Sequence, residues 1–135
     1  MMRPALTAQL SEKARALLDA RSFAVLSTVQ PDGSPQSSVI WVKRDGDDLL
    51  FSTFEGRRKH LNLLRDPRVS VVVNPPQAPY TYLEIRGSAT VTTEGGRELI
   101  DELANKYTGK DNTRGGPETV WVVVRVTPSK VVDSI

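Results

Sequence analysis

The segment EGRRKHLNLLRDPRVSVVV, residues 55–73, gathers five cations at a short helical pattern that runs into a valine-rich strand. Two of the cations, Arg57 and Lys59, flank the first helical turn, where unpaired backbone N–H groups and the helix dipole favour an anion. The strand before the helix ends in Ser52 and Thr53, whose hydroxyl groups can donate to the same anion. Together these residues predict a phosphate-binding pocket.

The same cluster is also compatible with a solvated surface or with a nucleic-acid groove. A run of cations is often only a solvated helix face, although acidic residues that would balance such a face are sparse, with Glu55 and Asp66 at its two ends. A nucleic-acid groove would need aromatic side chains on a basic strand face. The chain is only 6% aromatic, its formal net charge is +2, and Tyr80 and Tyr82 lie near no lysine-rich stretch, so we expect no nucleic-acid binding.

Other chemistries lack the residues that they need. With one histidine and no cysteine, a metal site would depend on carboxylates, which occur mostly in turns and on helix faces, so we expect no metal. A Ser–His–Asp triad would have to use His60, which lies in the cationic helix start and is expected at the surface. The glycine pairs in TEGGRE and TRGGPE lack the Lys-Ser/Thr ending of a phosphate-binding loop.

The composition is that of an ordinary globular domain. The chain has 135 residues, 39% hydrophobic and 25% charged, so residues 1–135 are expected to form one domain around one core. No apolar run is long enough to cross a bilayer, and the first residues show no secretory signal. The absence of cysteine suits a reducing compartment, and we expect a cytoplasmic protein without membrane contact.

The elements that must position the cationic cluster are mostly strands. Runs of β-branched residues separated by turns such as QPDGSP and RDGDD predict antiparallel pairing, with six or seven strands in all. A sheet curled into a small barrel suits this chain length, because closure removes exposed edges. The expected strands cover residues 22–29, 36–43, 49–53, 68–74, 80–93, 119–128 and 129–135.

Two or three short helices complete the pattern. The first, over residues 11–21, begins at the N-cap Ser11. The second carries the cationic cluster and ends at Asp66-Pro67, since proline disfavours helix at the residue before it. Its apolar stripe is expected to be Leu61, Leu63 and Leu64. The third begins at Thr93, buries Leu99, Ile100, Leu103, Ala104 and Tyr107, and ends at Gly109.

The order of these motifs resembles the pyridoxamine 5′-phosphate oxidase-like flavin and deazaflavin proteins, and among them the actinobacterial-type group that uses coenzyme F-420. The resemblance extends from Ser11 to Pro128. Its most specific part is the spacing Arg-x-Lys-x-x-Asn-Leu-x-x-Asp-Pro, matched by Arg57, Lys59, Asn62, Leu63, Asp66 and Pro67. A turn with the pattern Asp-Gly-x-Pro adds support through Asp32, Gly33 and Pro35.

The resemblance implies a mainly β (α+β) fold, an FMN-binding-like split β-barrel. It also implies a homodimer with a cofactor in each cleft between the subunits. Arg57 and Lys59 would hold the cofactor phosphate, helped by Ser52 and Thr53. Tyr80 would reach the cofactor of the partner subunit. The strand after the Asp-Gly turn would lie along the flavin-like ring through Ser38, Val39, Ile40 and Trp41.

The activity implied is an oxidoreductase in which coenzyme F-420 exchanges a hydride with a small unsaturated or quinone-like acceptor, with no catalytic acid–base residue. The chain lacks the arginine-rich C-terminal segment of the true oxidases, so vitamin B6 oxidation is not expected. Alternatives are an FMN-binding oxidoreductase of the same fold and a non-enzymatic protein that binds or stores flavin or haem. The positive charges of Lys110, Arg114 and Arg97 would attract the acidic tail of F-420. The favoured interpretation is nevertheless that they are ordinary surface residues.

Overall fold

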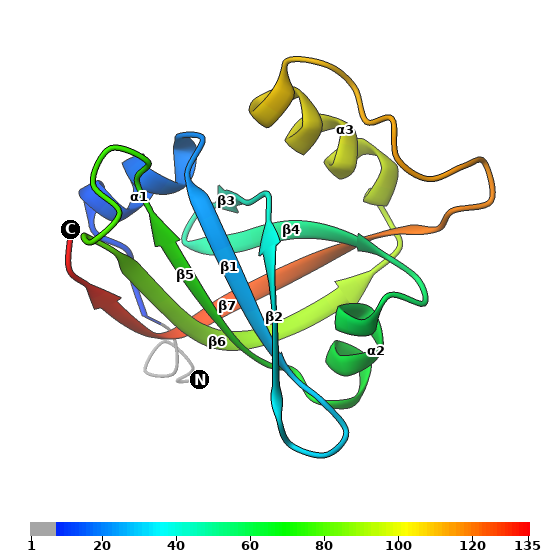
Figure 1. The fold of residues 1–135 in the computed structure, drawn as a ribbon, viewed down its shortest axis with the longest axis horizontal. Helices are drawn as coiled ribbons and strands as arrows, with labels where there is room; N and C mark the ends of the chain where they lie inside the picture. Colours follow the sequence, from blue (N-terminus) through cyan, green and yellow to red (C-terminus); the bar gives the residue numbers. More distant parts are fainter. Residues whose placement is uncertain (1–7) are drawn as a thin grey trace.

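Antiparallel strands make up most of the molecule (Figure 1). The computed structural model describes residues 8–135, and its strands form one sheet in the order β2-β1-β5-β6-β7-β4-β3. The expected mainly β (α+β) architecture is confirmed. The strands are β1 Phe23–Val29, β2 Pro35–Ile40, β3 Lys43–Asp45, β4 Asp48–Phe54, β5 Arg68–Asn74, β6 Leu83–Thr92 and β7 Trp121–Asp133. The helices are α1 Glu12–Asp19, α2 Arg58–Arg65 and α3 Gly96–Thr108.

The connection between β2 and β3 makes the sheet curl. These strands are the two edges of the sheet, yet only Trp41 and Val42 separate them in the chain. Two residues cannot span an open seven-stranded sheet, because neighbouring strands lie about 4.8 Å apart. The two edges therefore meet, and the strand expected over residues 36–43 is broken at this junction. Trp41 and Val42 are called the edge junction below.

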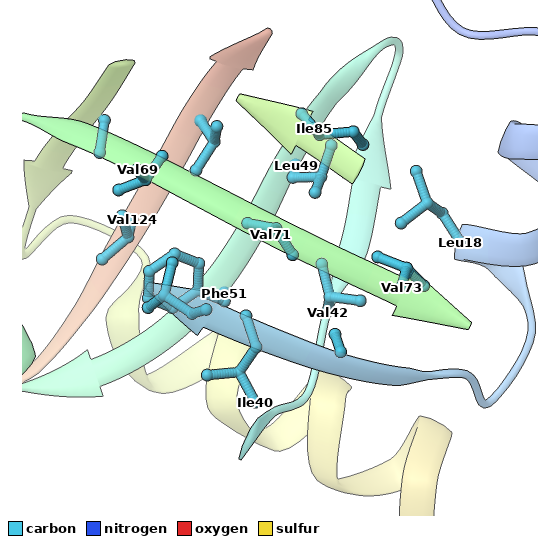
Figure 2. Packing of buried hydrophobic residues seen from close by; sticks show 14 of the residues in the cluster. Leu18, Ile40, Val42, Leu49, Phe51, Val69, Val71, Val73, Ile85 and Val124 are labelled. Carbon is cyan, nitrogen blue, oxygen red and sulfur yellow. The ribbon is translucent and has the colours of Figure 1, made fainter. Parts of the chain in front are cut away.

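The core lies inside the curled sheet. Along β5, Val69, Val71 and Val73 are buried, whereas Ser70 and Val72 lie on the outer face. Figure 2 shows Val71 and Val73 pointing toward side chains that come from β2, β4 and α1. Each fully buried aliphatic or phenylalanine side chain contributes about 1.5–3 kcal/mol, so this core fixes the strands that carry the site.

Helices α1 and α3 end largely where the sequence indicates. The Ser11 hydroxyl accepts the Ala14 N–H at 3.1 Å, so the expected N-cap of α1 is confirmed. Helix α3 ends at Gly109 as expected, but its N-cap is Gly95 rather than Thr93. Gly95 has φ 80°, a left-handed conformation that glycine adopts at little cost, and Thr93 contributes only its carbonyl.

Helix α2 does not bury the stripe that its apolar pattern predicts. Leu63 is buried, but Leu61 and Leu64 are exposed, so the prediction is wrong at two of three positions. The buried face also carries polar side chains, namely Lys59, His60 and Asn62.

Hydrogen bonds account for two of these buried polar side chains, although the side-chain oxygen of Asn62 has no partner among residues 8–135. The Asn62 side-chain N–H donates to the Thr28 hydroxyl at 3.0 Å, and the Gly56 backbone N–H donates to Nδ1 of His60 at 3.2 Å. Such partners offset the loss of hydration on burial. The expected surface position of His60 is therefore wrong, because its ring accepts the backbone N–H that precedes the helix.

The outer face of the sheet carries a row of exposed apolar side chains. Val25 on β1 lies directly opposite Val39 on β2 and opposite Val72 on β5. All three are exposed, as is Phe23, the first residue of β1. These four residues are called the apolar row.

Within residues 8–135, the helices are too short and too polar to cross a membrane.

Candidate functional site

A cavity of about 280 Å³ lies beside the edge junction. Its walls come from the end of β2, the edge junction, β4, the first turn of α2, α3, the segment between α3 and β7, and the start of β7. The volume is at the lower end of the range usual for small-molecule sites, roughly 300–1,000 Å³. The residues that line it are Val39, Ile40, Trp41, Ser52, Lys59, Ile100, Leu103, Arg114 and Trp121.

Lys59 is the buried cation of this cavity. Its exposed fraction is only 8%, and its ammonium group has no hydrogen bond or ion pair with any described residue. Burial lowers the pKa of Lys59, and the nearby positive charges of Arg57 and Arg114 lower it further. An unpaired ammonium group on a largely buried side chain is costly without a compensating charge. Its surroundings therefore fit a negatively charged ligand.

Arg57 stands at the N-cap of α2, beside Lys59 but in solvent. Its guanidinium carbon lies 5.0 Å from the centre of the Phe54 ring, and its side chain does not cap the helix. The N–H groups of the first turn thus receive no capping oxygen from this residue, and an anion could take that place. Neither Arg57 nor Arg58, the next residue, is among the residues that line the cavity, and both are exposed.

Two buried polar atoms of cavity residues have no hydrogen-bond partner within residues 8–135. They are the Ser52 hydroxyl oxygen on β4 and the indole N–H of Trp121 on β7. These strands are neighbours, with Ser52 opposite Val123 and Phe54 opposite Trp121. Buried donors rarely remain unpaired. A hydroxyl group, an indole N–H and an ammonium group can all donate hydrogen bonds to phosphate oxygens. The residues present therefore fit a phosphate-bearing cofactor.

The remaining wall of the cavity is apolar. Trp41 at the edge junction stacks on Tyr107 of α3, with ring centres 5.6 Å apart and planes at 10°. Ile100 and Leu103 of α3 face the cavity, while Val39 is 71% exposed at its edge. Flat apolar surface next to cationic donors suits a ligand with a planar ring and a phosphate group.

The C-terminal part of α3 fixes the edge junction. The half-buried Lys106 ammonium group donates to the backbone carbonyls of Leu18 and Val42, both at 2.6 Å. The Tyr107 hydroxyl donates to the Ser22 carbonyl at 3.0 Å. Burial lowers the pKa of Lys106 to about 8 and raises the pKa of Tyr107. These bonds hold the Trp41–Tyr107 stack against the end of β2.

The structure brings five of the nine residues expected in the site to the cavity: Val39, Ile40, Trp41, Ser52 and Lys59. Ser38 has a buried hydroxyl without a partner but is not among the lining residues. Thr53 is buried outside the cavity lining, next to Ser52 along β4. Tyr80 is 96% exposed, away from this cavity of the same chain.

Sequence reasoning missed the contribution of α3 and β7. Ile100, Leu103 and Trp121 line the cavity although they follow the cationic segment at long distance in the sequence. Ile100 and Leu103 were expected only as a buried helix stripe, and no local signal connects them to Lys59. Among residues 8–135, no three His, Cys, Asp or Glu side chains gather in a way that could hold a metal ion.

The curled antiparallel sheet, with a phosphate-compatible cavity where its edges meet, defines a split β-barrel of the FMN-binding type, as expected. The chain belongs to the pyridoxamine 5′-phosphate oxidase family, because the model of that family matches residues 10–132.

Solved structures agree with this assignment. A structure named F420 reductase is 29% identical, with a TM-score of 0.81, and the match covers 91% of this chain and 98% of that one. A conserved hypothetical protein from Mycobacterium tuberculosis is 21% identical, with a TM-score of 0.74 and coverage of 97% and 88%. General Stress Protein 26 from Bacillus anthracis is 20% identical, with a TM-score of 0.68 and 89% of each chain covered. The last two share the fold.

Proposed function

We propose that the protein is an oxidoreductase that binds a phosphate-bearing flavin or deazaflavin, with coenzyme F-420 as the first choice and FMN as the alternative. The observation that carries the proposal is Lys59, a buried cation without a partner in a cavity that also has an apolar wall. The similarity to a structure named F420 reductase supports the deazaflavin. The acceptor would be a small unsaturated or quinone-like molecule.

Each part of the cavity has a role in this proposal. Lys59 and Arg57 bind the phosphate, with the Ser52 hydroxyl and the Trp121 N–H donating to its oxygens. Trp41, Ile40 and Val39 lie along the ring and exclude water from one side of it. When bound, the cofactor supplies the hydride. The chain itself binds and orients both reactants, and no side chain is needed as an acid–base catalyst.

The proposal includes a homodimer with the cofactor between the subunits. The apolar row leaves Phe23, Val25, Val39 and Val72 exposed on one sheet face, and contiguous exposed apolar residues often mark a protein interface. Val39 belongs both to this row and to the cavity wall, so a subunit seated on the row would also cover the cavity. Tyr80 would then reach the cofactor of the partner subunit.

Calorimetric titration of the purified protein with F-420, FMN and riboflavin tests the proposal. F-420 and FMN should bind more tightly than riboflavin, which has the ring but no phosphate. One lost charge-assisted contact, about 1.5–3 kcal/mol, corresponds to a factor of roughly 10 to 100. Tighter F-420 than FMN binding would support the deazaflavin. Equal affinity for FMN and riboflavin would remove the phosphate role of Lys59, and binding of none of them would overturn the proposal.

A further inference from the structure

A row of side-chain hydrogen bonds connects α2 with β1 and β2. The Asn62 side-chain N–H donates to the Thr28 hydroxyl at 3.0 Å, and this hydroxyl donates to the side-chain oxygen of Gln36 at 3.0 Å. Asn62 is fully buried, and Thr28 is 1% exposed. Water has little access to the bond between them, so breaking it leaves a buried polar group without a partner. Asn62, Thr28 and Gln36 are called the polar bridge.

The hydrogen bonds of the polar bridge run in one direction. The Gln36 side-chain N–H donates to the Ser37 carbonyl at 3.3 Å, which leaves the Gln36 side-chain oxygen to accept from Thr28. Because the Thr28 hydroxyl donates its one proton there, its oxygen accepts the Asn62 N–H. The side-chain oxygen of Asn62 has no partner within residues 8–135. Among these residues, Thr28 is therefore the only hydrogen-bond partner of the Asn62 side chain.

This bond determines how α2 sits on the sheet. Within residues 8–135, the side chains of α2 form two hydrogen bonds with the sheet, and both reach the end of β1. Asn62 donates to Thr28, and Arg65 donates to the Val29 carbonyl. Arg65 is exposed, so Asn62 supplies the buried link of the two. Leu63 packs into the core, but apolar contact has no preferred direction.

The placement of Lys59 depends on the placement of α2. Lys59 and Asn62 lie on the same buried face of the helix, because residues three apart in a helix are neighbours. The Lys59 ammonium group forms no hydrogen bond with the described residues. Its position in the cavity is therefore set by where the helix holds its backbone.

The polar bridge also reaches the opposite wall of the cavity. Gln36 belongs to β2, and residues Val39 and Ile40 of the same strand line the cavity. None of the three members of the polar bridge lines this cavity. The bridge can therefore fix the spacing between the Lys59 side and the β2 side without touching a ligand.

We infer that Asn62 is a positioning residue that acts through α2 and holds Lys59 at the place where a cofactor phosphate binds. Thr28 is the second positioning residue, because it joins Asn62 to β1 and β2. The inference rests on the proposed function. It assigns to the polar bridge the part of the affinity that depends on the phosphate, and not the part that depends on the ring.

Calorimetric titration with FMN and riboflavin tests the role of Asn62. Leucine has a similar branched side chain but cannot donate a hydrogen bond. Asn62→Leu should weaken FMN binding roughly 5- to 20-fold, which is part of the 10- to 100-fold effect of one charge-assisted contact, and should change riboflavin binding less than about 2-fold. If the protein binds F-420 and not FMN, F-420 and its ribityl deazaflavin fragment without the phosphate take the place of this pair.

A double-mutant cycle with Lys59→Met separates positioning from a general structural role. In the Lys59→Met protein, Asn62→Leu should change FMN affinity by less than about 2-fold, because the contact on which Asn62 acts is already lost. A purely structural effect of Asn62 would instead be equally large with and without Lys59.

Two substitutions of Thr28 test the same link from the strand side. Thr28→Val keeps the shape of the side chain without the hydroxyl and should reproduce the selective loss of FMN affinity. Thr28→Ser keeps the hydroxyl and should bind FMN within about 2-fold of the wild type. Thermal unfolding shows whether each variant is folded at the titration temperature, and Thr28→Val decides the question if Asn62→Leu does not fold.

Ser22→Ala is the matched control at the other end of β1. It removes a hydrogen bond from the buried Ser22 hydroxyl to the Leu17 carbonyl but keeps the Ser22 carbonyl, to which Tyr107 donates. The ratio of FMN to riboflavin affinity should stay within about 2-fold of the wild type.

Two outcomes overturn the inference alone. They are an equal loss for FMN and riboflavin in Asn62→Leu and Thr28→Val, and a loss of FMN affinity that is the same with and without Lys59. In both cases the wild type still prefers FMN to riboflavin, so the proposed function stands. A wild type that binds the phosphate-bearing and the phosphate-free ligand equally well would remove the phosphate role of Lys59 and the inference together.

Discussion

Gly96 lies directly against the backbone of Trp121. A Cβ atom built on Gly96 would lie 2.0 Å from the Trp121 carbonyl oxygen and 2.5 Å from its carbonyl carbon. This contact brings the first turn of α3 onto the start of β7. It therefore sets how closely α3, with Ile100 and Leu103, covers the cavity.

Gly96→Ala should push α3 away from β7 and destabilise the protein. Overpacking against a rigid backbone typically lowers the free energy of unfolding by about 1–3 kcal/mol, and urea denaturation measures it. Glu98→Ala, at an exposed position in the first turn of the same helix, should change it by less than about 0.5 kcal/mol. Similar values for both variants would mean that α3 moves freely on the sheet.

Lys59→Met should weaken F-420 or FMN binding while making the ligand-free protein more stable to heat. The first effect follows from the lost phosphate contact, roughly 10- to 100-fold in affinity. The second follows because methionine has a similar length but no buried, unpaired charge. Calorimetric titration and thermal unfolding give the two values. Arg58→Gln is the matched control, since Arg58 is exposed, and a binding loss as large as that of Lys59→Met would indicate only a diffuse positive field.

Val25→Lys should convert the proposed dimer to a monomer. Val25 lies at the centre of the apolar row, between Val39 and Val72, so a lysine there would place a charge inside the interface. Sedimentation at micromolar concentration shows the change. Leu64→Lys makes the same substitution on the exposed side of α2 and should leave the association state unaltered. A wild type that sediments as a monomer would contradict the dimer itself.

Lys106 should make stability depend on pH between about 8 and 10.5. Its pKa is lowered from 10.5 to about 8 in the folded state, so within this window the unfolded chain binds more protons and stability rises with pH. The slope from one such group is at most about 1.4 kcal/mol per pH unit. Asp19 and Glu102 raise this pKa, while Lys43 lowers it.

Comparing the wild type with Lys106→Met isolates the pH dependence of stability that Lys106 causes. The pH dependence that Lys59 causes is the same in both proteins. Urea denaturation at pH 7, 8, 9 and 9.5 stays below the range in which Tyr107 titrates. The difference in unfolding free energy between the two proteins should be constant up to about pH 8 and should then shift in favour of the wild type. A difference that does not change with pH would show that the Lys106 amine titrates normally.

Local chemistry explains which parts of the fold the sequence predicted. Ser11 caps α1, Pro67 follows the end of α2, and Gly109 ends α3, because each effect depends on a few neighbouring residues. The register shift of β6 lies between Arg86 and Gly87, at a glycine within a strand, where such irregularities are common. The strands were recognised for the same reason, with two exceptions. The edge junction separates β2 from β3, and residues 119–128 and 129–135, expected as two strands, form the single strand β7.

The parts that the sequence did not predict depend on contacts between distant segments. Helix α2 packs on β1 through the hydrogen bond between Asn62 and Thr28, which are 34 positions apart, and this contact overrules the apolar pattern of the helix. The cationic segment pointed to Ser52 and Lys59, and the family resemblance added Val39, Ile40 and Trp41, which together are about half of the residues that line the cavity. The other half was not predicted, because only folding of α3 and β7 onto β4 brings Trp121 and Arg114 to Lys59.

The cavity has an optical consequence. The sequence contains two tryptophans, and both of them, Trp41 and Trp121, line this one cavity. Their emission therefore comes entirely from its walls, and a conjugated ring bound between them would quench it by accepting excitation energy. The unlabelled protein thus contains its own fluorescent reporter of occupancy. Trp41→Phe and Trp121→Phe would show separately how the ring-side and phosphate-side walls respond as a ligand enters.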